Sequence, residues 1–172
     1  MAEIRSTLDI IMEKAKTLTV TDEDKKEFAK KEVQGRVQGL FQKYLDGILS
    51  TDQMKREMAS FDKDLKSVAE KELLAACLSA MTVEGDNQPF FEMLDRLLGC
   101  DIKPILDLID EFQKQQNVER SKRSVDLIQT LSELGVSGSA VIPNLAADTA
   151  WRDFILNMQE RFQERLKVLK RV

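Results

Sequence analysis

The fold is decided by residues 21–81, which read TDEDKKEFAKKEVQGRVQGLFQKYLDGILSTDQMKREMASFDKDLKSVAEKELLAACLSAM. Apolar side chains recur here at the three- and four-residue spacing of amphipathic helices, in two runs separated by Asp46-Gly47. The first run is Phe28, Val33, Val37, Leu40, Phe41, Tyr44, Leu45 and Ile48, and the second is Met54, Met58, Phe61, Leu65, Val68 and Leu73. We therefore predict two long helices that fold back on each other as an antiparallel hairpin.

Local signals mark the ends of both predicted helices. Thr21 is a good N-cap, because the acidic residues that follow it suit the positive end of a helix dipole. Gly47 is a typical C-terminal stop, and the run from Ser50 to Gln53 has the pattern of a capping box. The second helix is then predicted to run unbroken from Thr51 to about Met81.

Two glycines, Gly35 and Gly39, lie one turn apart within the first predicted helix. Each costs about 1 kcal/mol relative to alanine in a helix interior, which predicts that something approaches closely there. The favoured interpretation is a tight helix crossing or a bend within the fold, and a close subunit interface is the alternative. The charged residues around the glycines exclude a membrane-embedded helix dimer.

Helices are also predicted before and after the hairpin. An amphipathic helix is expected over residues 4–16, and a fourth helix is expected between Pro89 and Gly99. A fifth helix follows from Asp101, and a turn near Asn117 separates it from a sixth, with one continuous helix as the alternative. Residues 136–147 are predicted to form a loop, and a last helix begins at Asp148 or Thr149.

The expected architecture is thus an all-α bundle of six to seven helices organised on the hairpin of residues 21–81. Its 172 residues contain 42% hydrophobic and 33% charged residues, with 7 glycines and 3 prolines, a balance typical of a soluble helical protein. We predict a single domain over residues 1–172. A division into a long-hairpin part, 1–83, and a short-helix part, 86–172, is the alternative.

Composition excludes several classes of site. The sequence has no histidine, so it contains no Ser-His-Asp or Cys-His triad and no histidine metal ligand. Its two cysteines are too few for a disulfide framework, and reduced thiols indicate the cytoplasm. The start of the chain lacks the apolar core of a signal peptide, and no run of about 20 apolar residues predicts a membrane span.

Charge is distributed unevenly along the chain. The net charge of −4 argues against a dedicated nucleic-acid protein, which makes nucleic-acid contact through Arg120, Lys122 and Arg123 a minor hypothesis. Residues 84–112 hold eight acidic side chains against two basic ones, and basic clusters follow. We expect this asymmetry to attract parts of one bundle, or two subunits, to each other.

The most enzyme-like pattern is a pair of acidic i, i+3 motifs, Glu92 with Asp95 and Asp107 with Asp110. Carboxylates one turn apart share a helix face, and two such faces could hold Mg²⁺ through oxygen ligands. In this respect about twenty residues resemble the all-α nucleotide pyrophosphatases, which implies a Mg²⁺-dependent nucleotide phosphohydrolase. We favour a solvated acidic face without a metal, because these carboxylates flank the apolar stripes.

The function predicted from the sequence is a non-enzymatic cytoplasmic interaction or adaptor module that self-associates and needs no cofactor. The reason is that long amphipathic arms offer more apolar surface than a monomeric hairpin can cover. Trp151, the only tryptophan, is predicted to anchor the core, with an interface as the alternative. The sequence does not identify the protein partner.

Overall fold

The computed structural model describes residues 21–169, and this part of the chain is helical without any strand. Its helices are α2 (Asp22–Leu45), α3 (Thr51–Ala59), α4 (Lys63–Ala80), α5 (Gln88–Glu92), α6 (Lys103–Glu133) and α7 (Thr149–Leu169). A π-helical turn, η1 (Met93–Leu97), continues α5, and a 3-10 turn, η2 (Leu145–Ala147), precedes α7. The predicted all-α class is confirmed. The helix expected over residues 4–16 lies outside the described residues.

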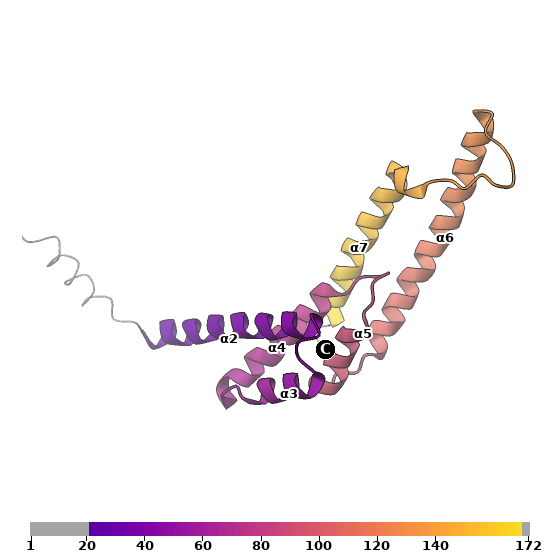
Figure 1. Ribbon diagram of the computed structural model, residues 1–172. Helices are drawn as coiled ribbons and strands as arrows, with labels where there is room; N and C mark the ends of the chain where they lie inside the picture. The colour runs from indigo at the N-terminus through magenta and orange to yellow at the C-terminus, as the bar shows by residue number, and fades with distance from the viewer. Residues whose placement is uncertain (1–20, 170–172) are drawn as a thin grey trace, which may run out of the picture.

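The chain folds back after α2, where the sequence signals placed the turn (Figure 1). At the start of α2 the Thr21 hydroxyl accepts the Asp24 N–H at 3.1 Å, and the Asp24 carboxylate accepts the Thr21 N–H at 2.9 Å. The Thr21 hydroxyl also donates to the Asp24 carboxylate at 2.7 Å, and this bond, together with that from the Thr21 N–H, lowers the pKa of Asp24. Gly47 ends the helix with a φ of +72°, and Ser50 caps α3 through the predicted capping box.

The second arm of the hairpin is two helices, so the prediction of one helix from Thr51 to Met81 was wrong. The Ser60 hydroxyl donates to the Glu57 carbonyl at 2.7 Å, and Asp62 is extended at φ −56° and ψ 146°. Ser60 competes with the helix in this way, because its short polar side chain bonds to nearby backbone. The break turns Phe61 into the core and sends α4 across α2.

Polar contacts join α2 to both halves of the broken arm. Gln34 donates to Glu72 of α4 at 2.6 Å, while Arg36 donates to Glu57 and Ser60 at 2.9 and 2.8 Å. Figure 1 shows α3 running back along α2 and α4 turning again behind both. The hairpin is therefore a three-helix unit, with its two glycines on the side of α2 that α4 does not cover.

The predicted turn near Asn117 is also absent, because α6 is one continuous helix of 31 residues. Its polar middle is helical and keeps most of its side chains in water. The helix ends at Gly135, whose φ is +83°, and the Val136 N–H closes the end by donating to the Leu131 carbonyl at 2.9 Å. Of the two candidate caps for α7, Asp148 is the one used, since it accepts the Ala150 N–H at 3.2 Å.

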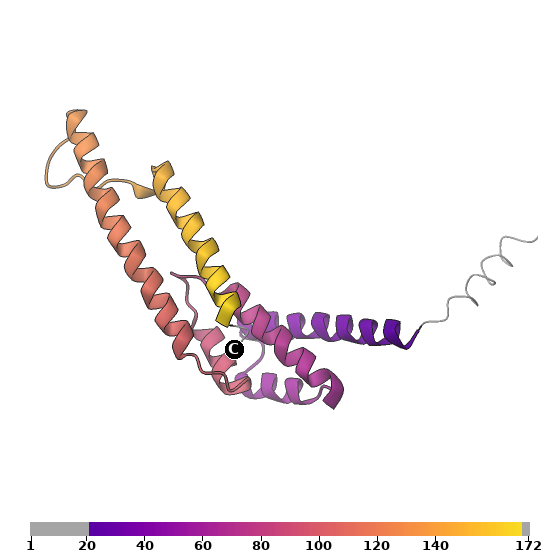
Figure 2. The ribbon, with the colours of Figure 1, turned by 180° about the vertical axis from the view of Figure 1, so that it is seen from behind.

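One hydrophobic cluster holds these helices together, and it draws buried residues from α2, α3, α4, α5, η1, α6 and α7. Its fully buried centre includes Val37, Met54, Leu73, Phe112 and Phe162. Two parts project from this body in different directions, the first half of α2 and the paired ends of α6 and α7 (Figures 1 and 2). Between residues 21 and 169, no helix combines the length and the apolar character needed to cross a bilayer.

Candidate interaction surface on the α6–α7 arm

The feature that most needs an explanation is the projecting pair of helices, here called the arm and defined as residues 113–157. The structure describes every residue of this range, and Gln116 is the only one that is buried. Seven large aliphatic side chains of the arm are exposed, namely Val118, Val125, Ile128, Leu134, Val136, Ile142 and Leu156. Their exposed fractions run from 44% at Ile128 to 89% at Ile142. The arm thus has apolar surface but no core of its own.

The arm has little buried surface because the inward face of α6 turns polar in the middle of the helix, before it becomes apolar again at the half-buried Leu127 and Leu131. In the first half, Ile105, Leu108 and Phe112 face the core. At helical spacing, the same face continues as Gln116, Glu119 and Arg123, which are polar. Val118, Val125 and Ile128 lie roughly 120–160° around the helix from Phe112 at 3.6 residues per turn.

These outward residues form a regular line, here called the outer stripe and made of Val118, Ser121, Val125, Ile128 and Ser132. Their spacing alternates between three and four residues, which is the heptad spacing of a helix that pairs with another helix. Val118 and Val125 are 71% and 64% exposed. All five residues of this line are exposed, and Ile128, at 44%, is the most covered of its three aliphatic side chains.

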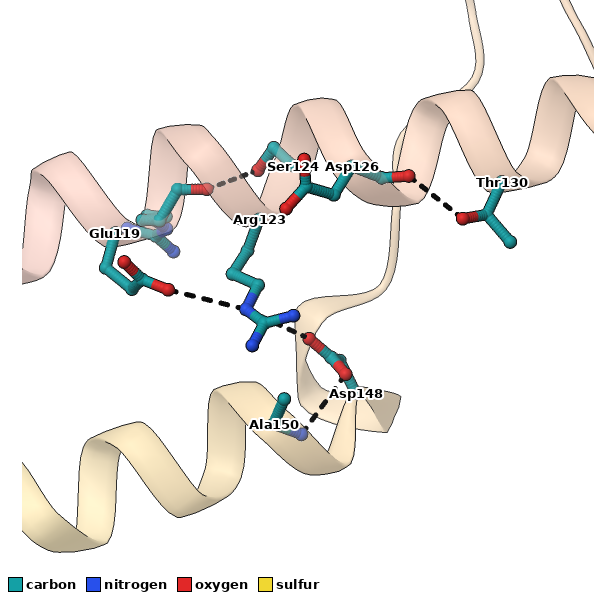
Figure 3. A network of polar contacts seen from close by, with 8 residues as sticks. Glu119, Arg123, Ser124, Asp126, Thr130, Asp148 and Ala150 are labelled. Carbon is teal, nitrogen blue, oxygen red and sulfur yellow. Dashed lines mark hydrogen bonds and ion pairs between the residues drawn. The ribbon is translucent and has the colours of Figure 1, made fainter.

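Charged side chains lie on the inner side of the arm, between α6 and the start of α7, as Figure 3 shows. The Arg123 Nε lies 3.4 Å from Glu119 Oε1 on α6 and 4.0 Å from Oδ2 of Asp148, the cap of α7. Neither Arg123 Nε nor Asp148 Oδ2 makes a hydrogen bond within the described residues, although both atoms are shielded from solvent. Such a long, partly desolvated ion pair adds little stability, so the arm is held mainly where its helices enter the core.

Trp151 lies on the arm and not in the core cluster. Its side chain is half-buried and stacks on Phe154, with ring centroids 5.6 Å apart and planes 25° apart. Phe154 in turn packs against the core cluster. The tryptophan therefore extends the apolar side of α7 outward along the arm, opposite the polar inner face of α6.

Gly35 and Gly39 do not make the close crossing predicted within the fold. Both are exposed, about 160° around α2 from the buried Val37. A Cβ atom added to either glycine would meet nothing within 4 Å in the described part of the chain. Of the alternatives, a close subunit interface at these glycines stays a prediction.

The two acidic motifs do not converge on one site. Glu92 accepts a hydrogen bond from the Tyr44 hydroxyl at 3.2 Å and lines a hollow with Asp95, while Asp107 lines a separate one beside Arg165. Asp110 is bonded to Lys114, and this bond raises the pKa of the lysine.

Within residues 21–169 no three acidic or cysteine side chains lie close enough together to hold a metal ion. The acidic residues of the i, i+3 motifs, Glu92, Asp95, Asp107 and Asp110, therefore do not assemble into the Mg²⁺ site that their spacing suggested.

A cavity of about 390 Å³ lies where α4, η1 and the start of α6 meet the end of α7. Its walls are apolar apart from the Cys100 thiol and the Asp101 carboxylate, and they include Leu74, Leu94 and Leu169. Both cysteines are free, with Cys77 fully buried and Cys100 half-buried. Burial raises the pKa of both thiols, that of Cys77 to about 12, so neither is poised as a nucleophile.

The raised thiol pKa of Cys77 predicts a pH dependence of stability. Above about pH 9 the unfolded chain loses the thiol proton while the folded protein keeps it, so the free energy of unfolding should fall as pH rises toward 12. The slope from this group is about 1.4 kcal/mol per pH unit. Urea unfolding between these pH values should show that Cys77→Ala is less pH-dependent than the unchanged protein. Parallel pH curves for the two proteins would contradict the assignment.

The sequence contained the signal for the outer stripe, but sequence reasoning missed it. The predicted turn near Asn117 would place Val118 apart from Val125 and Ile128, which would then belong to a separate sixth helix. Once α6 is continuous, the three fall on one line.

Comparisons of the chain with protein-family models, with curated proteins and with solved structures found no match.

Proposed function

We propose that this protein is a non-enzymatic, self-associating interaction module of the cytoplasm, and that the arm is its binding surface. The observation that carries the proposal is the gathering of seven exposed aliphatic side chains on an arm with a single buried residue. Scattered exposed aliphatic residues are ordinary on protein surfaces, but three of these seven, Val118, Val125 and Ile128, fall on one line of a projecting helix, as at an interaction site. A projecting helical hairpin also gains most of its stability from a partner that covers its apolar side.

Other observations support the remaining parts of the proposal. A non-enzymatic role is supported by the lack of histidine, by the separation of the acidic motifs, and by thiols whose pKa values are raised. A cytoplasmic location is supported by free cysteines, which persist as thiols in a reducing compartment. The partner most directly available to an exposed helical stripe is a second copy of the same chain.

Self-association predicts a mass that depends on concentration. The chain has a mass of 19.6 kDa, and its weight-average mass should rise toward twice that value as the concentration increases from the low to the high micromolar range. Sedimentation equilibrium measures this directly. A mass that stays at 19.6 kDa across the whole range would remove self-association from the proposal.

A further inference from the structure

We infer that two copies pair through the outer stripe of α6, with the two helices antiparallel about a two-fold axis. This inference rests on the proposed function, because it specifies which surface and which partner the self-association uses. A symmetric dimer is the commonest homo-oligomer, and it requires a surface that is complementary to itself. The outer stripe meets that requirement in its spacing, in its side-chain sizes and in its charges.

The outer stripe has the composition of a helix-pairing seam. Val118, Val125 and Ile128 are β-branched and exposed, and each supplies an apolar knob for a facing helix. Ser121 and Ser132 occupy the remaining positions of the same repeat with small side chains, which let the two backbones approach. No charged residue interrupts the line between Val118 and Ser132.

Charge decides the direction of pairing. Toward the body of the protein, the same side of α6 continues as Lys114, Asp110 and Asp107, which are all exposed. A parallel, in-register pair would set each of these charges against its own copy, and like charges brought together are destabilising. In an antiparallel pair they face the other end of the partner arm, where residues 134–147 carry no charge.

The tip of the arm also fits antiparallel pairing. Leu134, Val136 and Ile142 are 74%, 50% and 89% exposed. The loop that carries Val136 and Ile142 lies on the side of α6 away from α7 (Figures 1 and 2). In the antiparallel arrangement this loop comes near Lys114 of the second copy, whose methylene stem can cover apolar surface while its ammonium group stays in water. The four helices of two arms then form one layered bundle.

The size of the contact indicates a reversible dimer. An overlap from Lys114 to Ser132 is about 27 Å long at 1.5 Å per residue, and a helix presents a strip about 10 Å wide. On this basis each copy buries on the order of 300–500 Å² before the tip is added, whereas a stable interface buries about 800 Å² per partner. The dimer should therefore form at micromolar or higher concentration and dissociate on dilution.

The first test places a charge on the outer stripe of the full chain. Val125→Glu and Ile128→Glu should each abolish the rise of mass with concentration, because a carboxylate would be buried in the seam. Thr130→Glu is the matched control, since it adds the same charge to the same helix at an exposed residue about 160° around α6 from Ile128. It should dimerise like the unchanged protein, and circular dichroism should show that all variants are folded.

The outcomes separate the inference from the proposed function. If the unchanged protein stays monomeric, self-association and this interface both fail. If the unchanged protein associates and Val125→Glu associates equally, the copies meet elsewhere and only the inference is overturned. Association lost in the Thr130→Glu control as well would also overturn it, because the effect would not be confined to the outer stripe.

The second test measures the direction of pairing by disulfide trapping, with Cys100→Ser in every chain. In the antiparallel dimer Val118 lies near Ile128 of the second copy, so an equimolar mixture of Val118→Cys and Ile128→Cys chains should give the mixed disulfide in excess. In a parallel dimer each position meets its own copy, so an excess of the two symmetric disulfides would overturn the antiparallel arrangement.

Discussion

Phe162→Ala is expected to lower the free energy of unfolding by about 3–5 kcal/mol, the range for deleting a fully buried aromatic ring. Phe162 has no exposed surface and meets the ring of Phe112 edge to face, with centroids 5.4 Å apart. This aromatic pair joins α7 to α6 where both helices enter the core. Urea unfolding followed by circular dichroism measures the change.

The matched control for Phe162→Ala is Phe28→Ala, which removes the same ring from the exposed part of α2. Phe28 is 64% exposed, and its loss should change stability by no more than about 0.5 kcal/mol. Comparable losses for the two variants would mean that α7 does not depend on the Phe112 contact for its position. The assignment of Phe162 to the core would then be wrong.

Asn117→Pro is expected to cost about 3 kcal/mol or more, because Asn117 lies in the interior of the continuous helix α6. Proline removes the backbone N–H at this position, and its ring collides with the preceding turn of the helix. The Asn117 side chain is exposed, so the effect comes from the backbone alone. Unfolding free energy and helical content from circular dichroism should both decrease.

Asn117→Ala serves as the control, and it should be neutral or slightly stabilising because alanine favours helix. The comparison distinguishes the two structures that the sequence left open. A turn near residue 117 would accept proline with little loss, whereas the interior of a 31-residue helix cannot. A fully stable Asn117→Pro protein would therefore restore the interpretation with two helices.

The helix ends were predictable because they depend on contacts within a few residues. The N-caps Thr21 and Ser50 and the left-handed Gly47 all lie where the sequence placed them. The break at Ser60 was missed because the apolar repeat continues across it through Phe61. The continuity of α6 at Asn117 was missed because a polar stretch within a helix has the same composition as a loop.

The candidate interaction surface could not be predicted in the same way. Its residues were visible in the sequence, but their role depends on which side of α6 faces α7. The same limitation explains Gly35 and Gly39, which lie on the open side of α2, and the acidic motifs, which face different hollows. Periodicity shows that a helix has two faces, yet it does not show which neighbour each face meets.

The sequence by itself determined that the described chain is helical and where most of its helices begin and end, because propensity, caps and glycine stops act over four residues or fewer. Only the tertiary structure decided how those helices face one another. Contacts such as that of Phe112 with Phe162, or of Arg123 with Asp148, join residues far apart in sequence. Their geometry follows from the packing of the whole core, which fixed α6 with Phe112 inward and its outer stripe in water.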